Sequence, residues 1–144
     1  MNRPLREPAE VSIEFRDELL AQCWPDDTQL ARLTGAAPWR DLAAYAAGLR
    51  AAGKILGVWS AAQEVYRHPD FQFDATGRVR AGIADLLAQL PGAGDRGGWR
   101  QAFWLYSPHA LLGGRLPAEI FPENPARVIE VARREFADDR DACW

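Results

Sequence analysis

Cysteine and histidine are scarce in this sequence of 144 residues, which contains two of each. Cys23 and Cys143 stand far apart and form no C-x-x-C pair, and no cluster of such residues surrounds His68 or His109. A zinc site needs three or four ligands close together, so we expect no bound metal. Two isolated thiols are typical of a protein in a reducing cytoplasm, where they stay free.

Long hydrophobic runs and an excess of positive charge are also missing. No run approaches the roughly 18 apolar residues of a transmembrane helix, and residues 1–15 contain no apolar signal region. The net charge is −3, from 17 basic and 20 acidic residues. Residues 1–74 are slightly acidic and residues 75–144 are balanced, so neither half has the basic field of a strong DNA-binding protein. We therefore expect a cytoplasmic protein that does not bind membranes.

The sequence lacks recognisable catalytic motifs. The glycines of residues 91–98 match neither a P-loop nor a dinucleotide-binding fingerprint, because no lysine accompanies them and no strand is predicted before them. They predict a flexible loop that could act as a hinge. Ser107 and His109 lie in one predicted turn, without a nucleophile elbow or an oxyanion loop. We therefore expect neither an enzyme nor a cofactor.

Hydrophobic residues are plentiful, at 48% of the chain with six tryptophans, which supports a packed core. Their helical spacing and the breaks at proline and glycine predict a mainly α fold. We expect helices over residues 11–24, 29–34, 39–52, 78–90, 99–106 and 126–137. Asn124 is the predicted N-cap of the last helix and Pro125 its first residue. Residues 1–10 contain two prolines and mixed charges, which predict a mobile arm.

Residues 11–74 form a predicted N-terminal domain with the outline of a helix-turn-helix. Two helices are separated by Gly35 and Pro38, and apolar residues then alternate around short polar breaks over residues 54–73. This alternation predicts a small β hairpin, or wing, although residues 61–65 could instead be helical. The remaining residues, 75–144, form the predicted second domain.

Arg40, Arg50 and Lys54 are the candidate DNA-binding residues of the first domain, because arginine and lysine contact base edges and phosphates. Most of the other residues in the predicted recognition helix are alanine and leucine, which suit packing better than base reading. The alternative is therefore a structural or dimerising helix.

The most specific stretch is residues 99–121, with the sequence WRQAFWLYSPHALLGGRLPAEIF. Its aromatic helix places Trp99 and Phe103 on one face, and Pro108 cannot continue it. A loop then ends in two glycines, which can take a positive φ. Pro117 stands where the first turn of a short helix would begin.

This order of features resembles the Xre/MbcA/ParS toxin-binding domain of antitoxins. The resemblance rests on an aromatic helix, the pattern L-x-G-x-x-P, a short helix and a closing amphipathic helix. The matching residues are Trp104-Leu105, Leu112-Gly113-Gly114-Arg115, Pro117-Ala118-Glu119-Ile120 and Val128 to Phe136. The segments GKILGVW and YRHPDFQFD also resemble the winged helix-turn-helix heads that precede this domain in some antitoxins.

The resemblance implies a type II antitoxin that neutralises a cognate toxin by covering its active site. Such toxins are commonly RES-domain enzymes that consume NAD, and such antitoxins usually assemble symmetrically, which implies a homodimer. The matching toxin-binding candidates are Arg115, Arg127, Arg133, Arg134, Asp141 and Trp144.

Other interpretations stay open at this point. A solvated helix face, with Glu130 paired to Arg134, would explain the helix charges as well as a partner does. Trp144 could enter a partner or fold back on its own domain. The alternative function is a transcriptional regulator that binds operator DNA and dimerises through its second domain. An adaptor for a different partner is a third interpretation.

Overall fold

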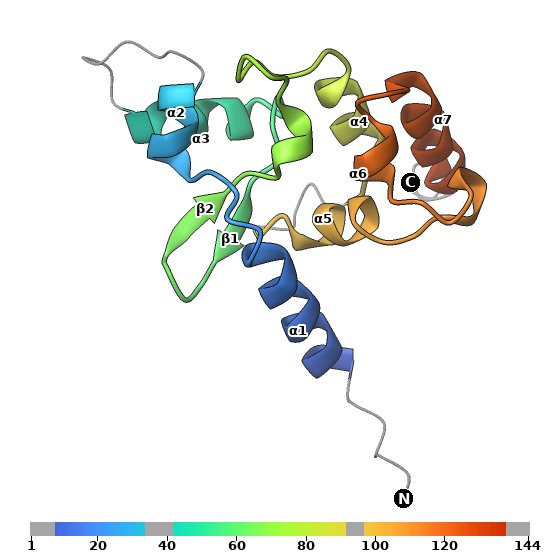
Figure 1. Cartoon of the computed structure of the whole chain (residues 1–144), viewed down its shortest axis with the longest axis horizontal. Helices are drawn as coiled ribbons and strands as arrows, with labels where there is room; N and C mark the ends of the chain where they lie inside the picture. The colour runs from blue at the N-terminus through green and yellow to red at the C-terminus, as the bar shows by residue number, and fades with distance from the viewer. Residues whose placement is uncertain (1–7, 34–41, 92–96, 138–144) are drawn as a thin grey trace, which may run out of the picture.

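The computed structural model describes residues 8–33, 42–91 and 97–137 (Figure 1). The helices are α1 (Pro8–Leu20), α2 (Asp27–Leu33), α3 (Leu42–Ala51), α4 (Ile83–Gln89), α5 (Trp99–Leu105), α6 (Pro117–Ile120) and α7 (Pro125–Glu135). Two short 3-10 helices, η1 (Asp70–Gln72) and η2 (Ala110–Leu112), and two strands, β1 (Val58–Ser60) and β2 (Val65–Arg67), complete the described elements. The predicted mainly α fold class with a small hairpin is confirmed, and the winged helix-turn-helix arrangement stays a prediction.

The first helix begins earlier than predicted. α1 starts at Pro8, so residues 8–10 belong to this helix rather than to the predicted arm, and residues 1–7 lie outside the described part. Proline suits the first turn because its missing N–H would have no helical partner there. The helix ends at Leu20, and Cys23 then takes a positive φ of 59°. A helix does not continue through this conformation.

The helix α4 begins at Ile83, so its predicted start is too early. Phe73 forms an antiparallel bridge with Val79, and the N–H of Arg80 donates to the carbonyl of Gln72 at 2.7 Å. These backbone bonds pair the two sides of a turn. Residues that form a turn of this kind cannot also form the first helical turn.

The hairpin lies where the alternating apolar residues predict it. β1 and β2 are antiparallel, and Trp59 lies opposite Tyr66 with the two ring centroids 5.1 Å apart, edge to face. Residues 61–64 form the turn between the strands, so the helical alternative for residues 61–65 is wrong.

The principal core contains residues from both sides of Asp74. From the first predicted domain it takes Leu19, Trp24, Leu56, Val58 and Phe71, and from the second Ile83, Leu86, Trp99, Leu105, Phe121, Val128 and Ala132. A smaller core lies under α2 and α3 and consists of Leu30, Ala46, Ile55 and Phe73. The division into two domains stays a prediction, but the main hydrophobic core crosses the proposed boundary.

Backbone contacts join the hairpin to α5. The N–H of Trp59 donates to the carbonyl of Gly97 at 2.9 Å, and the indole of Trp99 donates to the carbonyl of Trp59 at 2.9 Å. Gly98, with a φ of +71°, approaches the Gly57 backbone. Within the predicted hinge, these last two glycines are therefore packed against β1, and residues 92–96 lie outside the described part.

No helix within the described ranges is long and apolar enough to cross a lipid bilayer.

Candidate functional site

The segment with the most specific sequence folds as α5, η2, α6 and α7. Figure 1 shows α6 and α7 side by side at one end of the molecule, with the segment between α5 and α6 next to them. The local predictions are confirmed: Gly113 and Gly114 have φ values of +67° and +80°, and the Asn124 side chain accepts the N–H of Arg127. Pro117 is at the first turn of α6.

The segment between α5 and α6 exposes one leucine and buries the next. Leu111 is 51% exposed, whereas Leu112 packs into the interior at 6%. The guanidinium of Arg127, on α7, donates from Nη2 to the carbonyl of Leu111 at 3.1 Å. Arg115 ends the same segment. We refer to Leu111, Arg115 and Arg127 as the Leu111 surface.

The predicted toxin-binding arginines are exposed but have intramolecular contacts. Arg115 lies 3.8 Å from Glu119 and 3.7 Å from Glu123, and Arg134 lies 3.2 Å from Glu130. The last distance confirms the predicted helical pair. At these exposed positions such ion pairs are weak, so a partner could compete for the side chains.

Only part of the predicted set comes together in the structure. Arg115 lies in the segment between α5 and α6 and Arg127 contacts this segment at Leu111, whereas Arg133 and Arg134 occupy the last turn of α7. Two further candidates, Asp141 and Trp144, lie outside the described residues. Sequence reasoning missed Leu111; the signal was two adjacent leucines before two glycines in a short loop, where only one can face the core.

The predicted DNA-binding residues are placed differently. Arg50 is only 16% exposed, and its guanidinium lies 2.5 Å from Asp27 and 4.0 Å above the Tyr66 ring. The Arg50 side chain therefore connects α3 to Asp27 of α2 and to Tyr66 of the hairpin, and it does not extend into solvent. Lys54 is exposed after α3, and Arg40 lies outside the described residues.

His68 completes this cluster and is fully buried. Its Nδ1 lies 2.9 Å from the carbonyl of Pro25, so this nitrogen must carry a proton and donate. Its Nε2 lies 2.9 Å from Nη1 of Arg50 and must therefore accept. Burial lowers the pKa of His68; the Pro25 carbonyl opposes this shift, Arg50 adds to it and the Asp27 carboxylate opposes it.

We expect acid to destabilise the protein through His68. The pKa of His68 is 6.5 in the unfolded chain and lower in the folded protein, so the unfolded chain binds a proton more readily between these two values. The stability that is present above pH 6.5 is therefore lost as the pH falls from 6.5 towards the folded-state pKa. The free energy of unfolding should fall by up to about 1.4 kcal/mol per pH unit. Urea unfolding between pH 7.5 and 5.5 measures this, and His68→Gln should flatten the dependence. An equal slope in both proteins would contradict the assignment.

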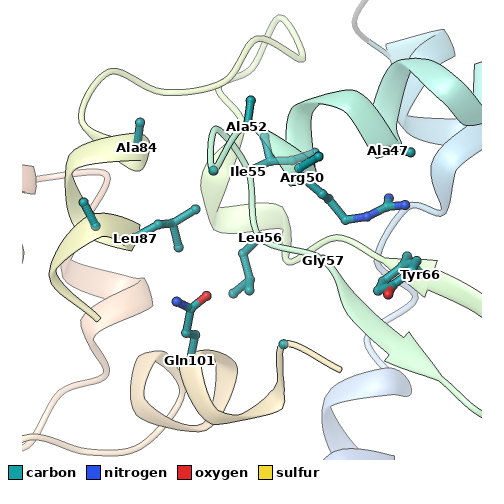
Figure 2. A pocket seen from close by; sticks show the side chains of 14 residues that line it. Ala47, Arg50, Ala52, Ile55, Leu56, Gly57, Tyr66, Ala84, Leu87 and Gln101 are labelled. Atoms are coloured by element: carbon teal, nitrogen blue, oxygen red, sulfur yellow. The ribbon is translucent and has the colours of Figure 1, made fainter. Parts of the chain in front are cut away.

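A cavity of about 670 Å³ lies between the end of α3, α4 and the start of α5 (Figure 2). Its described lining residues are Ala47, Arg50, Ala51, Ala52, Gly53, Ile55, Leu56, Gly57, Tyr66, Ala84, Leu87, Ala88, Gly98 and Gln101. Figure 2 shows Leu56, Leu87 and Gln101 around the hollow. No carboxylate, histidine, serine or cysteine is among these described lining residues; the ionisable side chains among them are Arg50 and Tyr66.

Ser107 and His109, which lie in one predicted turn, have separate hydrogen-bond partners. The hydroxyl of Ser107, which follows α5, donates to the carbonyl of Phe103 in that helix at 2.5 Å. The imidazole of His109 contacts Leu111 and Glu135 instead. Across residues 8–33, 42–91 and 97–137, no three residues of the kinds His, Cys, Asp or Glu lie close enough together to hold a metal ion.

Comparison of the chain with models of protein families, with curated proteins and with solved structures finds no match.

Proposed function

We propose that this protein is a type II antitoxin that binds a cognate toxin through the Leu111 surface and occludes the toxin's active site. The observation that carries the proposal is the exposed Leu111 side chain, with its backbone held by Arg127 and with Arg115 in the same segment. A large apolar side chain in water gains nothing from its exposure, whereas burial of the exposed half of Leu111 in a partner contributes about 1 kcal/mol.

The surroundings of Leu111 suit a protein partner. Arginine is enriched among the residues that dominate interface energies, and its stem adds apolar area while its head adds hydrogen bonds. The segment is also ordered in advance, because backbone hydrogen bonds of His109 with Leu112, Gly114 and Arg115 close its turn and Arg127 holds the Leu111 carbonyl. A surface that is ordered before binding loses less conformational entropy when the partner arrives.

The identity of the partner comes from the resemblance of residues 99–136 to the toxin-binding domain. We infer that the toxin is a RES-domain enzyme that consumes NAD, and that Arg133 and Arg134 contact the rim of the interface. Asp141 and Trp144 enter the proposal from the same resemblance. A homodimer is the proposed assembly, because antitoxins of this kind usually assemble symmetrically.

The discriminating observation against the DNA-binding alternative is the position of Arg50. Its guanidinium is paired with Asp27 and His68, so the predicted recognition helix offers one candidate base contact fewer. A gel shift with the upstream DNA tests this alternative. Tight and salt-sensitive binding would favour the regulator.

We expect co-expression with the product of the adjacent gene to decide between these functions. The neighbour should inhibit growth alone, and it should be silenced by this protein and co-purify with it. Leu111→Asp should weaken the complex at least about 30-fold, which corresponds to the roughly 2 kcal/mol of a buried hot spot. Ala62→Asp, an exposed change in the β1–β2 turn, is the matched control and should bind normally.

Two results would count against the proposal. A harmless neighbour that does not bind would exclude the antitoxin function for this gene pair. A Leu111→Asp variant that neutralises the toxin like the wild type would place the interface elsewhere on the molecule.

A further inference from the structure

His109 is the hub of the segment that presents Leu111. Its backbone N–H donates to the carbonyl of Arg115 at 3.1 Å, and its carbonyl accepts the N–H groups of Leu112 at 3.0 Å and Gly114 at 2.9 Å. Its imidazole Nδ1 accepts the N–H of Leu111 at 3.1 Å. One residue therefore contacts both ends of this turn.

The same imidazole connects the turn to α7. Nε2 of His109 lies 3.1 Å from Oε2 of Glu135, and the indole N–H of Trp104 donates to the same oxygen. The Trp104 ring lies edge-on to His109 and to Phe136, with centroid distances of 5.7 and 5.8 Å. Glu135 thus accepts from two ring N–H groups that come from α5 and from the turn.

These contacts fix the orientation of the imidazole. Because Nδ1 accepts the N–H of Leu111, the proton of the neutral ring must lie on Nε2, where it points at Glu135. A flip of the ring would lose both partners. Histidine can bridge these two groups because its two nitrogens have opposite roles.

Leu111 is consequently held through both of its backbone groups. His109 accepts its N–H, and Arg127 donates to its carbonyl. Both holding side chains are anchored on or against α7. The exposed side chain between these two points has a defined direction, which a loosely attached loop would not give it.

We propose that His109 is a positioning residue for partner binding: with Glu135 and Trp104, it holds Leu111 in the conformation that enters the partner. This inference rests on the proposed function. It also gives Arg127 a second role, since its guanidinium holds the Leu111 carbonyl as well as lying at the interface.

Two substitutions separate the contacts of the imidazole. His109→Ala removes the contact with the Leu111 N–H and the contact with Glu135. His109→Asn keeps an acceptor for the Leu111 N–H, because an asparagine oxygen readily accepts from the N–H two residues on, but its side chain is too short to reach Glu135. Glu135→Ala is the reciprocal variant, which leaves the imidazole without its anchor on α7.

Amide hydrogen exchange of the full chain tests whether the imidazole orders the turn. We expect the Leu111 amide to exchange about tenfold faster in His109→Ala, and at nearly the wild-type rate in His109→Asn. Amides of α2 and α3 are the internal control and should not change. Unchanged exchange at Leu111 in His109→Ala would overturn the proposal.

Binding to the product of the adjacent gene tests whether that order matters for the partner. We expect His109→Ala and Glu135→Ala to weaken the complex about tenfold, mainly by faster dissociation, and His109→Asn to recover part of the loss. If the wild type binds and Leu111→Asp does not, but His109→Ala binds normally, the positioning role alone is overturned. If the wild type does not bind, the proposed function fails and the positioning role fails with it.

Discussion

Gly98→Ala is expected to lower the free energy of unfolding by about 3 kcal/mol or more, from backbone strain and a steric clash together. A Cβ at this position would overlap the Gly57 carbonyl oxygen and would lie 3.3 Å from Cδ1 of Leu56. The oxygen belongs to the backbone and cannot rotate away. The neighbouring Trp59–Gly97 hydrogen bond would have to lengthen or break to make room.

Gly113→Ala is the matched control for this prediction. Gly113 has almost the same positive φ, +67° against +71°, but nothing lies within 4 Å of the added Cβ. Its substitution should therefore show only the conformational penalty of about 1–2 kcal/mol. Urea unfolding of both variants measures the difference, and equal losses would show that the Gly57–Gly98 approach relaxes without strain.

The same experiment tests how the two predicted domains are coupled. Gly98 precedes α5 and Gly57 precedes β1, so their contact joins the first predicted domain to the second. Because the principal core contains residues from both sides of Asp74, we expect one unfolding transition that shifts as a whole. Two separate transitions would instead support two independent domains.

Gln72→Leu is the second substitution with a large expected effect. Gln72 is completely buried, and its amide pairs with the backbone like a short piece of strand. Its Oε1 accepts the Leu56 N–H at 2.6 Å, and its Nε2 donates to the carbonyls of Leu56 at 3.0 Å and Pro69 at 2.9 Å. Leucine has a similar volume but cannot replace any of these three bonds.

The expected loss is about 3 kcal/mol or more, because each unsatisfied buried backbone group costs about 1–3 kcal/mol and three groups lose their partner. Chemical denaturation of Gln72→Leu measures it. Gln22→Leu, at an exposed position in the turn after α1, is the control and should change stability by less than about 0.5 kcal/mol. A similarly small change at Gln72 would mean that water reaches these backbone groups.

Local signals predicted many of the elements correctly. Asn124 and Pro125 begin α7 as expected, the two glycines take the positive φ that ends the α5–α6 segment, and alternation predicted the hairpin. Each of these features depends on residues that are close together in the sequence. The start of α4 was missed, because the bridge between Phe73 and Val79 competes with the helix for the same residues.

The sequence by itself determined the helical character of this protein, its turns and the position of its hairpin, because caps, proline and glycine act over three or four residues. Only the tertiary structure decided which side chains are available. The guanidinium of Arg50 is paired with Asp27 and His68, which belong to other parts of the fold. Nothing in the local sequence distinguishes the exposed Leu111 from the buried Leu112. Burial and pairing depend on neighbours that are distant in sequence, which a local pattern does not record.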